Sequence, residues 1–375
     1  MTDSTQEYSP NSWIGILSSP VQIKKYKSKQ LLRSFSEANK DINAPIFFFT
    51  LNDVDIENKS IKGYHFDTDK GLSKKTFPYP AVLYNRVINL FMKKRYKPIL
   101  ESFRNEKVIL FNPVGRFNKW RLNILLSENE YIKEFIPHTV YFTENKLIKM
   151  LNLYQKVYIK GTLSGQGKHV VQVVRTPKNE YICRYYKNEL VEFKTKSFKQ
   201  LYRKLRQLLR RQKAVIQQMI DSTDKKIDLR VEAQRNKFNE IEIVGRIIRV
   251  GDKETPILNT RSNPKFYDLD EFFLNQVGYT ESELYSYKEK LSTLVEEIYT
   301  TIEGEYGTFA QMGIDFILDE NYNFWLIESN ATPGRKSLRA ASEREAYLKA
   351  YINVLEFAKW MIDNNKTVND QSLEL

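Results

Sequence analysis

Short apolar runs alternate with amphipathic stretches along the first third of the chain. Residues 13–18 (WIGILS), 44–51 (APIFFFTL) and 81–84 (AVLY) are apolar runs of strand length. Such runs are typical of strands buried on both faces of a sheet. Helix-like stretches at residues 30–39 and 86–96 lie between and after them. Strands that alternate with helices predict an open α/β layer over roughly the first 115 residues.

A turn-rich break at residues 112–118 (NPVGRFN) separates this layer from a second series of elements. A helix is expected at 119–127. Beyond it, strands at 157–160 and 169–175 are predicted to flank a glycine-rich loop at 161–168 (GTLSGQGK). The remaining elements expected in this part are a helical segment at 130–135, strands at 181–186 and 190–193, and a basic helix at 198–213.

The last part of the chain is predicted to carry an antiparallel sheet. A buried strand at 214–220 (AVIQQMI) is followed by paired strands at 229–235 and 242–250. A hairpin is expected where the strand at 313–318 (GIDFIL) meets the strand at 323–327 across a polar turn. Helical regions complete the pattern at 268–301 and 342–363, followed by a polar tail from residue 364.

These elements predict three domains and a tail. We expect an N-terminal α/β domain over residues 1–115, a small subdomain with the glycine-rich loop over 116–213, and a C-terminal subdomain over 214–365. Residues 366–375 are expected to form a flexible tail. At 375 residues the chain is long enough for more than one hydrophobic core, which is compatible with this division.

Composition narrows the class of protein. Hydrophobic residues make up 41% of the chain and aromatic residues 13%, which is typical of a soluble globular protein and argues against long disorder. The most apolar run, residues 44–51, is far too short to span a bilayer. The polar start of the chain lacks the pattern of a signal peptide. We therefore expect a cytoplasmic protein without a membrane partner.

The chain has too few cysteine and histidine residues for the disulfides and metal sites that these residues usually form. Cys183 is the single cysteine, so no intramolecular disulfide is possible and a reducing compartment fits. The three histidines, His65, His138 and His169, show no metal-ligand spacing, which argues against a zinc site. The sequence also shows no Ser-His-Asp or Cys-His arrangement for nucleophilic catalysis.

The chain is basic, with a formal net charge of +13 from 59 Lys and Arg residues against 46 Asp and Glu residues. This surplus attracts polyanions without choosing among them, and a solvated basic surface is equally compatible with it. The predicted helix at 198–213 concentrates the charge. Its apolar positions have helical spacing and are Phe198, Leu201, Leu205 and Leu208. A solvated face is the favoured interpretation of this helix, and contact with a polyanion is the alternative.

The strongest chemical signal is the segment at 313–334 (GIDFILDENYNFWLIESNATPG). Glu328 and Asn330 are two residues apart in a strand, so their side chains point to the same face. A turn of about four residues would set Asp315 opposite Glu328. Two carboxylates and an amide oxygen suit Mg²⁺, which would in turn bridge nucleotide phosphates. A hairpin with polar ends is the alternative, but burial of Asp315 without a partner is costly and favours a cation.

The glycine-rich loop is the second signal. Lys160 stands at the end of a strand and enters a loop that contains Gly161, Gly165 and Gly167. Glycines let backbone N–H groups approach phosphate oxygens, and the lysine adds positive charge. The loop is not a Walker A motif, because His169 stands where that motif needs Ser or Thr. A plain hairpin turn explains this loop equally well when it is considered alone.

A third, weaker signal is the segment at 216–230 (IQQMIDSTDKKIDLR). There an apolar strand runs into a polar loop, followed by Asp228 and Arg230 at strand spacing. By itself, such a pair is more typical of a structural ion pair than of a binding site.

Taken in chain order, these segments resemble the ATP-grasp superfamily. Lys119 in FNKW, Lys160 before the loop, the IQQMI strand, DLR, and D…ExN with a following PG occur in the ATP-grasp order. They resemble carboxylate–amine ligases of the ribosomal S6 glutamate ligase and D-alanine–D-alanine ligase types. The chain is more similar to the YheC/YheD endospore coat-associated ATP-grasp family, through IGIL, LYNR, LFNPVGRFNKWRLNILL, IPHT and IESNATPG. The resemblance spans roughly residues 13–362.

The resemblance implies a fold and a reaction. The fold would be α/β (α+β), an ATP-grasp fold preceded by an N-terminal open α/β pre-ATP-grasp domain, with ATP between the last two subdomains. The reaction would be that of a spore-coat-associated, Mg-ATP-dependent carboxylate–amine ligase that activates a carboxylate as an acyl phosphate. The cofactors would be ATP and one or two Mg²⁺ ions. A structural, ATP-binding protein of the spore coat with little or no catalysis is the alternative, and a polyanion-binding protein is a third.

The resemblance also implies partners and a location. The partners would be small-molecule or peptide carboxylate and amine substrates, acidic ones among them, and nucleic acid is not expected. The location would be cytoplasmic or spore-associated. The sequence names neither the substrates nor the oligomeric state.

The family assigns roles residue by residue. Arg230 and Arg249 would be catalytic, acting on the transferred phosphate and the acyl intermediate. The metal ligands would be Asp315, Glu328 and Asn330. Phosphate contacts would come from Lys119, Lys160, Ser164, Gly165, Gly167 and Lys168. Adenine and ribose contacts would come from Gln218, Met219 and Asp228.

Two stretches depart from the family pattern. Related ligases often carry glutamate at the position of Gln218, so this contact is expected to be weaker or mediated by water. Residues 258–266 (LNTRSNPKF) lack the usual Gly-Gly pair but match the RSN of the glutamate ligases at Arg261, Ser262 and Asn263. These three residues are expected to bind the nucleotide, and either Asn259 or Asn263 would face it.

Overall fold

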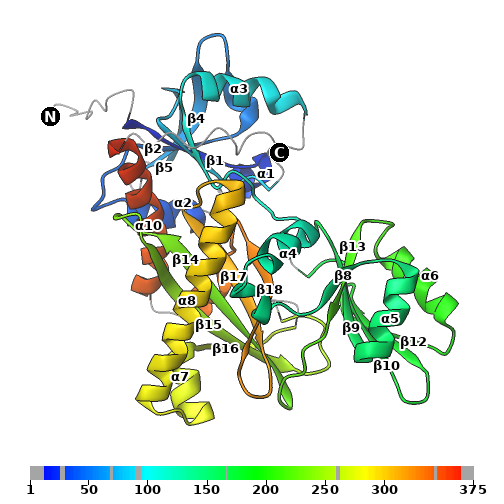
Figure 1. The fold of residues 1–375 in the computed structure, drawn as a ribbon. Helices are drawn as coiled ribbons and strands as arrows, with labels where there is room; N and C mark the ends of the chain where they lie inside the picture. Colours follow the sequence, from blue (N-terminus) through cyan, green and yellow to red (C-terminus); the bar gives the residue numbers. More distant parts are fainter. Residues whose placement is uncertain are drawn as a thin grey trace.

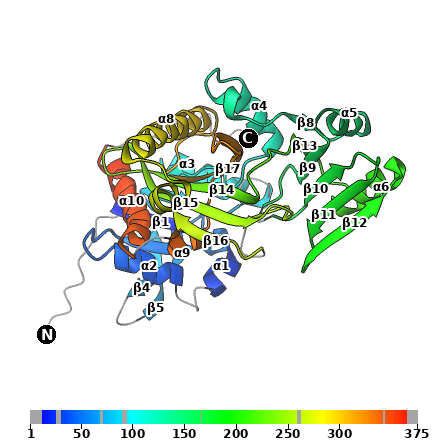
Figure 2. The same cartoon turned by 90° about the horizontal axis from the view of Figure 1, so that it is seen from below.

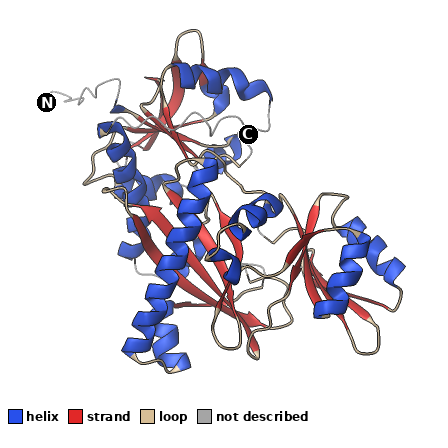
Figure 3. Ribbon diagram, in the orientation of Figure 1, coloured by secondary structure: helices blue, strands red, loops and turns tan. Residues whose placement is uncertain are grey.

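Three β-sheets organise the molecule (Figures 1 and 3). The computed structural model describes residues 12–25, 30–67, 71–88, 94–165, 167–258, 262–341 and 344–364. An N-terminal sheet, a small sheet and a large sheet follow one another along the chain. The mixed α/β fold expected from the sequence is confirmed.

The N-terminal sheet is built on parallel strands in the spatial order β2-β1-β6-β7, with an antiparallel extension at the β2 edge. Its first three parallel strands confirm the predicted apolar runs, and each is buried along its whole length. The strands are β1 (Ile14–Leu17), β2 (Ile46–Phe49), β3 (Val54–Asp55), β4 (Ser60–Asp67), β5 (Gly71–Pro78), β6 (Val82–Asn85) and β7 (Ile109–Phe111).

Helices cover both faces of the N-terminal sheet. On one face, α2 (Gln30–Ala38) packs in the same core as the parallel strands. On the other, α3 (Lys97–Asn105) contributes Ile99 and Phe103 to a second core. A short helix, α1 (Pro20–Lys25), follows β1. The helix predicted at 86–96 is wrong where it can be compared, because residues 86–88 are not helical and Lys94–Tyr96 form a 3-10 turn; residues 89–93 lie outside the described part.

The small sheet is antiparallel, in the order β12-β11-β10-β9-β13-β8. Two helices, α5 (Glu144–Tyr154) and α6 (Phe198–Leu208), pack on one face of it (Figure 2). The predicted hairpin around the glycine-rich loop is confirmed by the pairing of β9 with β10. The strands are β8 (Thr139–Tyr141), β9 (Lys156–Gly161), β10 (Val170–Arg175), β11 (Tyr181–Tyr186), β12 (Leu190–Thr195) and β13 (Ala214–Gln218).

The large sheet is antiparallel and contains the longest strands, in the order β16-β15-β14-β17-β18. The predicted antiparallel pair and hairpin are confirmed. A single core joins the sheet to the long helix α8 (Glu281–Tyr306) and to α4 (Lys119–Ser127). The strands are β14 (Lys225–Arg235), β15 (Ile241–Asp252), β16 (Lys265–Asp268), β17 (Gln311–Leu318) and β18 (Phe324–Asn330).

The helical region predicted at 268–301 is interrupted. It begins as α7 (Leu269–Phe272) and continues as a π-helical turn, Phe273–Val277. Gly278 has a φ of 87°, a left-handed conformation that glycine adopts without steric cost, and it ends this first part. A capping box between Thr280 and Glu283 then starts α8.

The C-terminal helix α10 (Arg344–Asp363) returns to the N-terminal sheet, where it lies beside α2 (Figure 1). Val354, Phe357 and Ala358 are buried in the same core as β1, β2 and β6. A short helix, α9 (Lys336–Ala341), precedes α10. Among the described helices, none has the length and apolar character needed to cross a membrane. The predicted tail at 366–375 lies outside the described residues.

Candidate active site

A cleft of about 750 Å³ lies between the small and large sheets. On one side it is lined by β9, the glycine-rich loop and the end of β13. On the other side it is lined by β14, β15, β17 and β18 and by the loop that follows β18. The cleft is therefore a product of tertiary packing between two separate sheets.

Fourteen of the seventeen site residues expected from the sequence line this one cleft. Ser262 and Asn263 do not line it, and Asn263 is exposed. Arg261 lies outside the described residues, as does Asn259, so the nucleotide contact expected of this stretch stays a prediction. The lining residues are Lys119, Lys160, Ser164, Gly165, Gly167, Lys168, Gln218, Met219, Asp228, Arg230, Arg249, Asp315, Glu328 and Asn330.

Two lysines enter the cleft from different elements. Lys119 is the first residue of α4, where Asn118 caps the helix by accepting hydrogen bonds from Trp120 N (3.0 Å) and Arg121 N (3.3 Å). Its ammonium forms an ion pair with the carboxylate of Glu328. Lys160 lies at the end of β9, and its Nζ donates to Oε1 of Gln217 over 2.5 Å.

Lys160 is buried, with 7% of its surface exposed. Burial lowers the pKa of this lysine to about 7, and the positive charges of Lys119 and Lys226 act in the same direction. Glu328 opposes the shift. The side chain of Lys160, which faces the cleft, is therefore only partly protonated at neutral pH.

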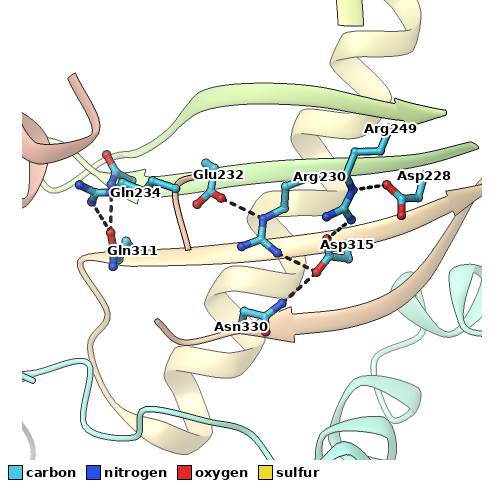
Figure 4. A network of polar contacts seen from close by, with 9 residues as sticks. Asp228, Arg230, Glu232, Gln234, Arg249, Gln311, Asp315 and Asn330 are labelled. Carbon is cyan, nitrogen blue, oxygen red and sulfur yellow. Dashed lines mark hydrogen bonds and ion pairs between the residues drawn. The ribbon is translucent and has the colours of Figure 1, made fainter. Parts of the chain in front are cut away.

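Asp315 is the centre of a charged network on the large sheet (Figure 4). Its Oδ2 accepts hydrogen bonds from Nη1 of Arg230 (2.7 Å) and Nδ2 of Asn330 (2.9 Å). Its Oδ1 accepts from Nη2 of Arg249 (2.6 Å). Arg249 also pairs with Asp228 through Nε. Asp228 and Arg230 thus belong to one network, although they do not pair with each other as a structural ion pair would.

The network sets the protonation of its members. Burial by itself would raise the pKa of Asp315, but the guanidinium groups of Arg230 and Arg249 outweigh it and hold the pKa below its usual value. For Asp228, burial dominates over Arg249 and raises the pKa to about 6. Burial also raises the pKa of Glu232, whose Oε1 accepts from Nε of Arg230 over 2.9 Å.

The hairpin register brings the expected metal ligands together. Asp315 pairs with Glu328, which confirms the predicted pairing, although the turn spans five residues, 319–323, and not four. A β-bulge follows, since Phe316 pairs with Leu326 and Ile327 is left as the extra residue. Glu328 and Asn330 lie beyond the bulge and both line the cleft.

The other end of the cleft is less charged. The backbone N–H of Gln218 donates to the carbonyl of His138 over 2.8 Å, and Met219 and Ile220 follow it along the lining. Tyr158 faces this region, and its hydroxyl accepts a hydrogen bond from Nζ of Lys226 over 2.7 Å. An aromatic ring and the apolar side chains of Met219 and Ile220 suit a flat heterocyclic base.

The cleft is strongly basic: nine cationic residues and three carboxylates are found among its described lining residues. Such an excess favours a ligand with several negative charges. The carboxylates are Asp228, Asp315 and Glu328, and the cations are Arg116, Lys119, Lys160, Lys168, Lys226, Arg230, Arg249, Lys253 and Lys336.

Four of these cations were not expected from the sequence. Lys226 could have been found, because it stands two residues before Asp228 and shares its face of β14. Arg116 lies in the turn-rich break, and its Nη1 donates to the carbonyl of Leu163 in the glycine-rich loop over 2.5 Å. A Cβ at Gly165 would lie 3.1 Å from this guanidinium, so a larger residue there would require the arginine side chain to shift slightly. For Lys253 and Lys336 we find no local sequence signal.

The donor atoms at Asp315, Glu328 and Asn330 fit Mg²⁺. Within the described part of the chain, no group of three or more His, Cys, Asp or Glu residues could hold a metal by itself. Mg²⁺ usually takes one or two carboxylates and completes its shell with phosphate oxygens and water. The two carboxylates and one amide therefore suit a metal that arrives with a phosphate ligand.

Comparisons with known proteins agree with this geometry. Residues 107–361 match the family described as YheC/D like ATP-grasp. The chain is 24% identical over 306 residues to the endospore coat-associated protein YheD of Bacillus subtilis (strain 168), an alignment that covers 77% of this chain and 64% of YheD. It is 22% identical over 259 residues to YheC of the same organism, covering 68% of this chain and 70% of YheC.

The fold is similar to that of solved ATP-grasp enzymes. D-alanyl-alanine synthetase A from Vibrio cholerae superposes with a TM-score of 0.52, covering 93% of this chain and 99% of that enzyme, at 14% sequence identity. At that identity the likeness shows the fold alone.

Proposed function

The chain belongs to the YheC/D-like ATP-grasp family, and on that premise we propose that it is a Mg-ATP-dependent ligase that activates a carboxylate as an acyl phosphate and joins it to an amine. The observation that carries the proposal is the convergence of fourteen expected site residues on one basic cleft. Charge and shape both support a nucleotide there, since the cationic end suits a triphosphate and the apolar end a base.

The phosphate end would be held by residues from three elements. Lys119 at the start of α4 and Lys160 at the end of β9 would supply positive charge there. The glycine-rich loop, with Ser164, Gly165, Gly167 and Lys168, would close over the phosphates and exclude water. At the other end, Gln218 and Met219 would meet the base and Asp228 the ribose.

Asp315, Glu328 and Asn330 would hold one or two Mg²⁺ ions. When bound, Mg²⁺ would neutralise phosphate charge and so lower the barrier to phosphoryl transfer. The carboxylate of Asp315 suits this role because the two arginines keep it ionised.

Arg230 and Arg249 are the proposed catalytic residues. Both guanidinium groups are fixed by ion pairs with Asp315, and Arg249 is fixed by Asp228 as well. Charges held in place before the reaction stabilise a developing negative charge without reorganisation. They would stabilise the transferred phosphoryl group and the acyl intermediate, so that the enzyme acts by positioning and charge and needs no protein nucleophile.

The substrates are proposed to be small-molecule or peptide carboxylates and amines. We place the protein in the cytoplasm or in association with the spore. A second candidate function, an ATP-binding structural protein of the spore coat with little or no catalysis, is favoured by the endospore coat association of YheD and YheC.

A substrate screen separates the two candidates. Purified protein with Mg-ATP would be mixed with amino acids, short peptides and cell-wall fragments, and both phosphate release and product mass would be measured. A ligase releases phosphate only when a carboxylate is added, and it yields a product heavier than the carboxylate by the amine minus water. ATP binding without phosphate release in every mixture would reject the ligase in favour of the structural role.

A further inference from the structure

Helix α6 carries a row of cations on its solvent side, which we call the basic stripe. Its first three members are separated by four and three residues, so they lie above one another on one face of the helix, and the fourth follows in the turn after the helix. Leu201, Leu205 and Leu209 on the opposite face have no exposed surface and fix the orientation of the helix. The stripe consists of Lys199, Arg203, Arg206 and Arg210.

The basic stripe has no acidic partner within the described part of the chain. Arg184 pairs with Glu192 at 2.8 Å and Lys156 with Asp221 at 2.9 Å on the same sheet, yet no stripe side chain forms an ion pair. The helix itself contains no Asp or Glu. Like charges one turn apart destabilise a helix, so helix stability does not explain this arrangement.

The helix dipole accounts for only part of the stripe. Cations near the C-terminus of a helix are favourable, which suits Arg206 and Arg210. Lys199 lies in the first turn, where a cation opposes the dipole and an acidic residue would be stabilising. An interaction of these cations with a group outside the helix explains all four positions.

The C-terminal end of the basic stripe is a strained turn. Arg210 (φ 49°) and Arg211 (φ 60°) are consecutive left-handed residues, a conformation that is unfavourable for a residue with a side chain. Backbone hydrogen bonds hold the turn, from Arg210 N to Gln207 O (3.0 Å) and from Arg211 N to Arg206 O (3.2 Å). Strain of this kind is concentrated at functional sites.

This turn is bonded to the glycine-rich loop. The carbonyl of Lys213 accepts from Thr162 N over 2.9 Å, and the carbonyl of Leu208 lies 3.0 Å from Nδ1 of His169. Lys168, which lines the cleft, precedes His169. The stripe therefore runs along the outside of the small sheet and ends at the loop beside the cleft.

We propose that the basic stripe is a docking surface for an acidic peptide segment that carries the carboxylate substrate. From Lys199 to Arg206 the helical part of the stripe extends over about 10 Å, at ~1.5 Å per residue, which matches about three residues of extended peptide, and Arg210 follows it in the C-terminal turn. Charge complementarity identifies the occupant as a segment rich in Glu and Asp. Docking of the peptide depends on the charge of the basic stripe alone. The inference that docking delivers a substrate rests on the proposed ligase function.

The stripe suits a peptide better than a nucleic acid. Single-stranded nucleic acids bind proteins through aromatic platforms as well as charge. The aromatic residues of α6 are turned inward: Phe198 stacks on Tyr202, with ring centroids 6.4 Å apart, and Tyr202 stacks on Phe142 at 5.6 Å. The outer face thus offers charge without stacking, beside a cleft proposed to act on carboxylates.

Binding of a fluorescein-labelled octaglutamate peptide tests the proposal. Fluorescence anisotropy would be measured without nucleotide at two salt concentrations. The wild type should bind the peptide, and its affinity should fall as the salt concentration rises, since exposed charges are screened. The variant Lys199→Glu/Arg203→Glu/Arg206→Glu/Arg210→Glu should bind about tenfold more weakly or worse, because four attractive surface pairs are replaced by four repulsive ones.

A control with the same change in charge sits on the N-terminal part of the chain. The variant Lys62→Glu/Lys75→Glu/Arg104→Glu/Lys107→Glu reverses four exposed cations that form no ion pair within the described residues. It should bind octaglutamate within about twofold of the wild type if docking is local and not a response to net charge. If the reversed stripe does not fold, the corresponding four Lys or Arg to Gln changes remove the charge without adding repulsion.

Three outcomes overturn the proposal. Equal loss of octaglutamate binding in the stripe and control variants would show a net-charge effect. Tighter, stripe-dependent binding of an oligonucleotide of the same charge would assign the surface to nucleic acid. Self-association that the stripe variant abolishes would assign it to a second copy of the chain, whose α8 begins with Glu281 and Glu283. If octaglutamate binds but no carboxylate ever stimulates phosphate release, the ligase function fails while the docking surface stands.

Discussion

At the scale of single residues, Glu328 combines three structural properties. It pairs in register with Asp315, contacts the ammonium of Lys119 and lines the cleft. The carboxylate can exchange its lysine partner for a metal ion, which leaves the ammonium of Lys119 free to bind a phosphate. Its side chain is partly exposed, so it is not needed as a core contact.

Glu328→Gln should abolish turnover while the fold is kept. The amide keeps the size of the side chain but loses the charge that a Mg²⁺ ligand needs. Mg-dependent phosphate release would be measured alongside the urea midpoint of unfolding. Full Mg-dependent activity in this variant would remove Glu328 from the metal site.

Lys160 and Lys168 should differ in their effects. Lys160→Ala removes a buried cation from the phosphate end and should weaken ATP binding about tenfold or more, since charge-assisted hydrogen bonds in a partly closed site are strong. Lys168→Ala changes the covering loop and should lower the rate more than the affinity. Isothermal titration and steady-state kinetics measure both quantities. Small and equal losses of affinity would count against the loop as a phosphate clamp.

The depressed pKa of Lys160 predicts a pH dependence of ATP binding. With a pKa of about 7, the side chain is charged below pH 7 and mostly neutral above it, so ATP affinity should fall as pH rises through this value. A bound phosphate favours the charged form and raises the pKa, so binding near pH 7.5 to 8 should take up protons. Titration calorimetry in two buffers of different ionisation enthalpy measures this uptake. Lys160→Met should abolish it; uptake that persists in the variant would assign it to another group.

At the scale of elements, helix α4 is positioned by its cap. Asn118 closes the first turn of α4, and the next residue, Lys119, points into the cleft. Thr143 caps α5 in the same way by accepting from Lys146 N over 3.3 Å, but α5 packs on the far face of the small sheet. The caps of α4 and α5 therefore offer a matched pair of substitutions, one next to the cleft and one away from it.

Asn118→Ala should both destabilise the protein and weaken ATP binding. Loss of an N-cap costs about 0.5–2 kcal/mol, and fraying of α4 displaces Lys119. Thr143→Ala should cost a similar free energy of unfolding with unchanged ATP affinity. Urea unfolding and titration of ATP provide the comparison. If both variants bind ATP alike, the cap of α4 does not position Lys119.

At the scale of the whole molecule, Asn112 connects three segments. It is fully buried, and its left-handed φ of 53° is a conformation that asparagine tolerates better than most residues. Its Oδ1 accepts from Ala310 N (2.9 Å), and its Nδ2 donates to the carbonyls of Gln311 (3.1 Å) and Ala331 (2.7 Å). It thereby ties β7 to β17 and to the loop after the β17–β18 hairpin.

Asn112→Ala should lower the free energy of unfolding by about 2–4 kcal/mol, because it leaves buried backbone groups without partners. It should also lower activity, since the loop after Asn330 loses an anchor. Asn58→Ala serves as a control, because Asn58 is exposed and, among the described residues, its side chain bonds only to nearby Asp55, and it should change stability by less than about 0.5 kcal/mol. Similar losses in both variants would contradict the linking role of Asn112.

The elements that the sequence predicted are those with strong local periodicity. The strands in IGIL and IFFF and the helix from Lys119 to Ser127 are defined by runs of apolar residues or by a cap beside them. The hairpin of β4 and β5, the helix α5 and the strand β7 were not expected. β5 is exposed along much of its length, so its pairing with β4 and not an apolar pattern defines it.

For the site, the sequence by itself determined the residue types and their local spacing. Asp315, Glu328 and Asn330 follow from strand alternation and hairpin pairing, because both rules act over a few residues. The order of motifs was also sufficient to indicate the family. The alternation of side chains along a strand gives no information about the distance between Lys160 on the small sheet and Glu328 on the large sheet.

Only the tertiary structure decided which distant groups share one environment. The packing of two sheets set Lys160 near Lys119 and Lys226, so that its pKa falls, and it brought Arg230 and Arg249 onto Asp315. It also turned the leucines of α6 inward, left the basic stripe on the surface and ended that helix at Leu208. The reason is physical: periodicity reports which side of an element is buried, whereas electrostatic coupling depends on through-space distance and burial between elements that the chain order does not specify.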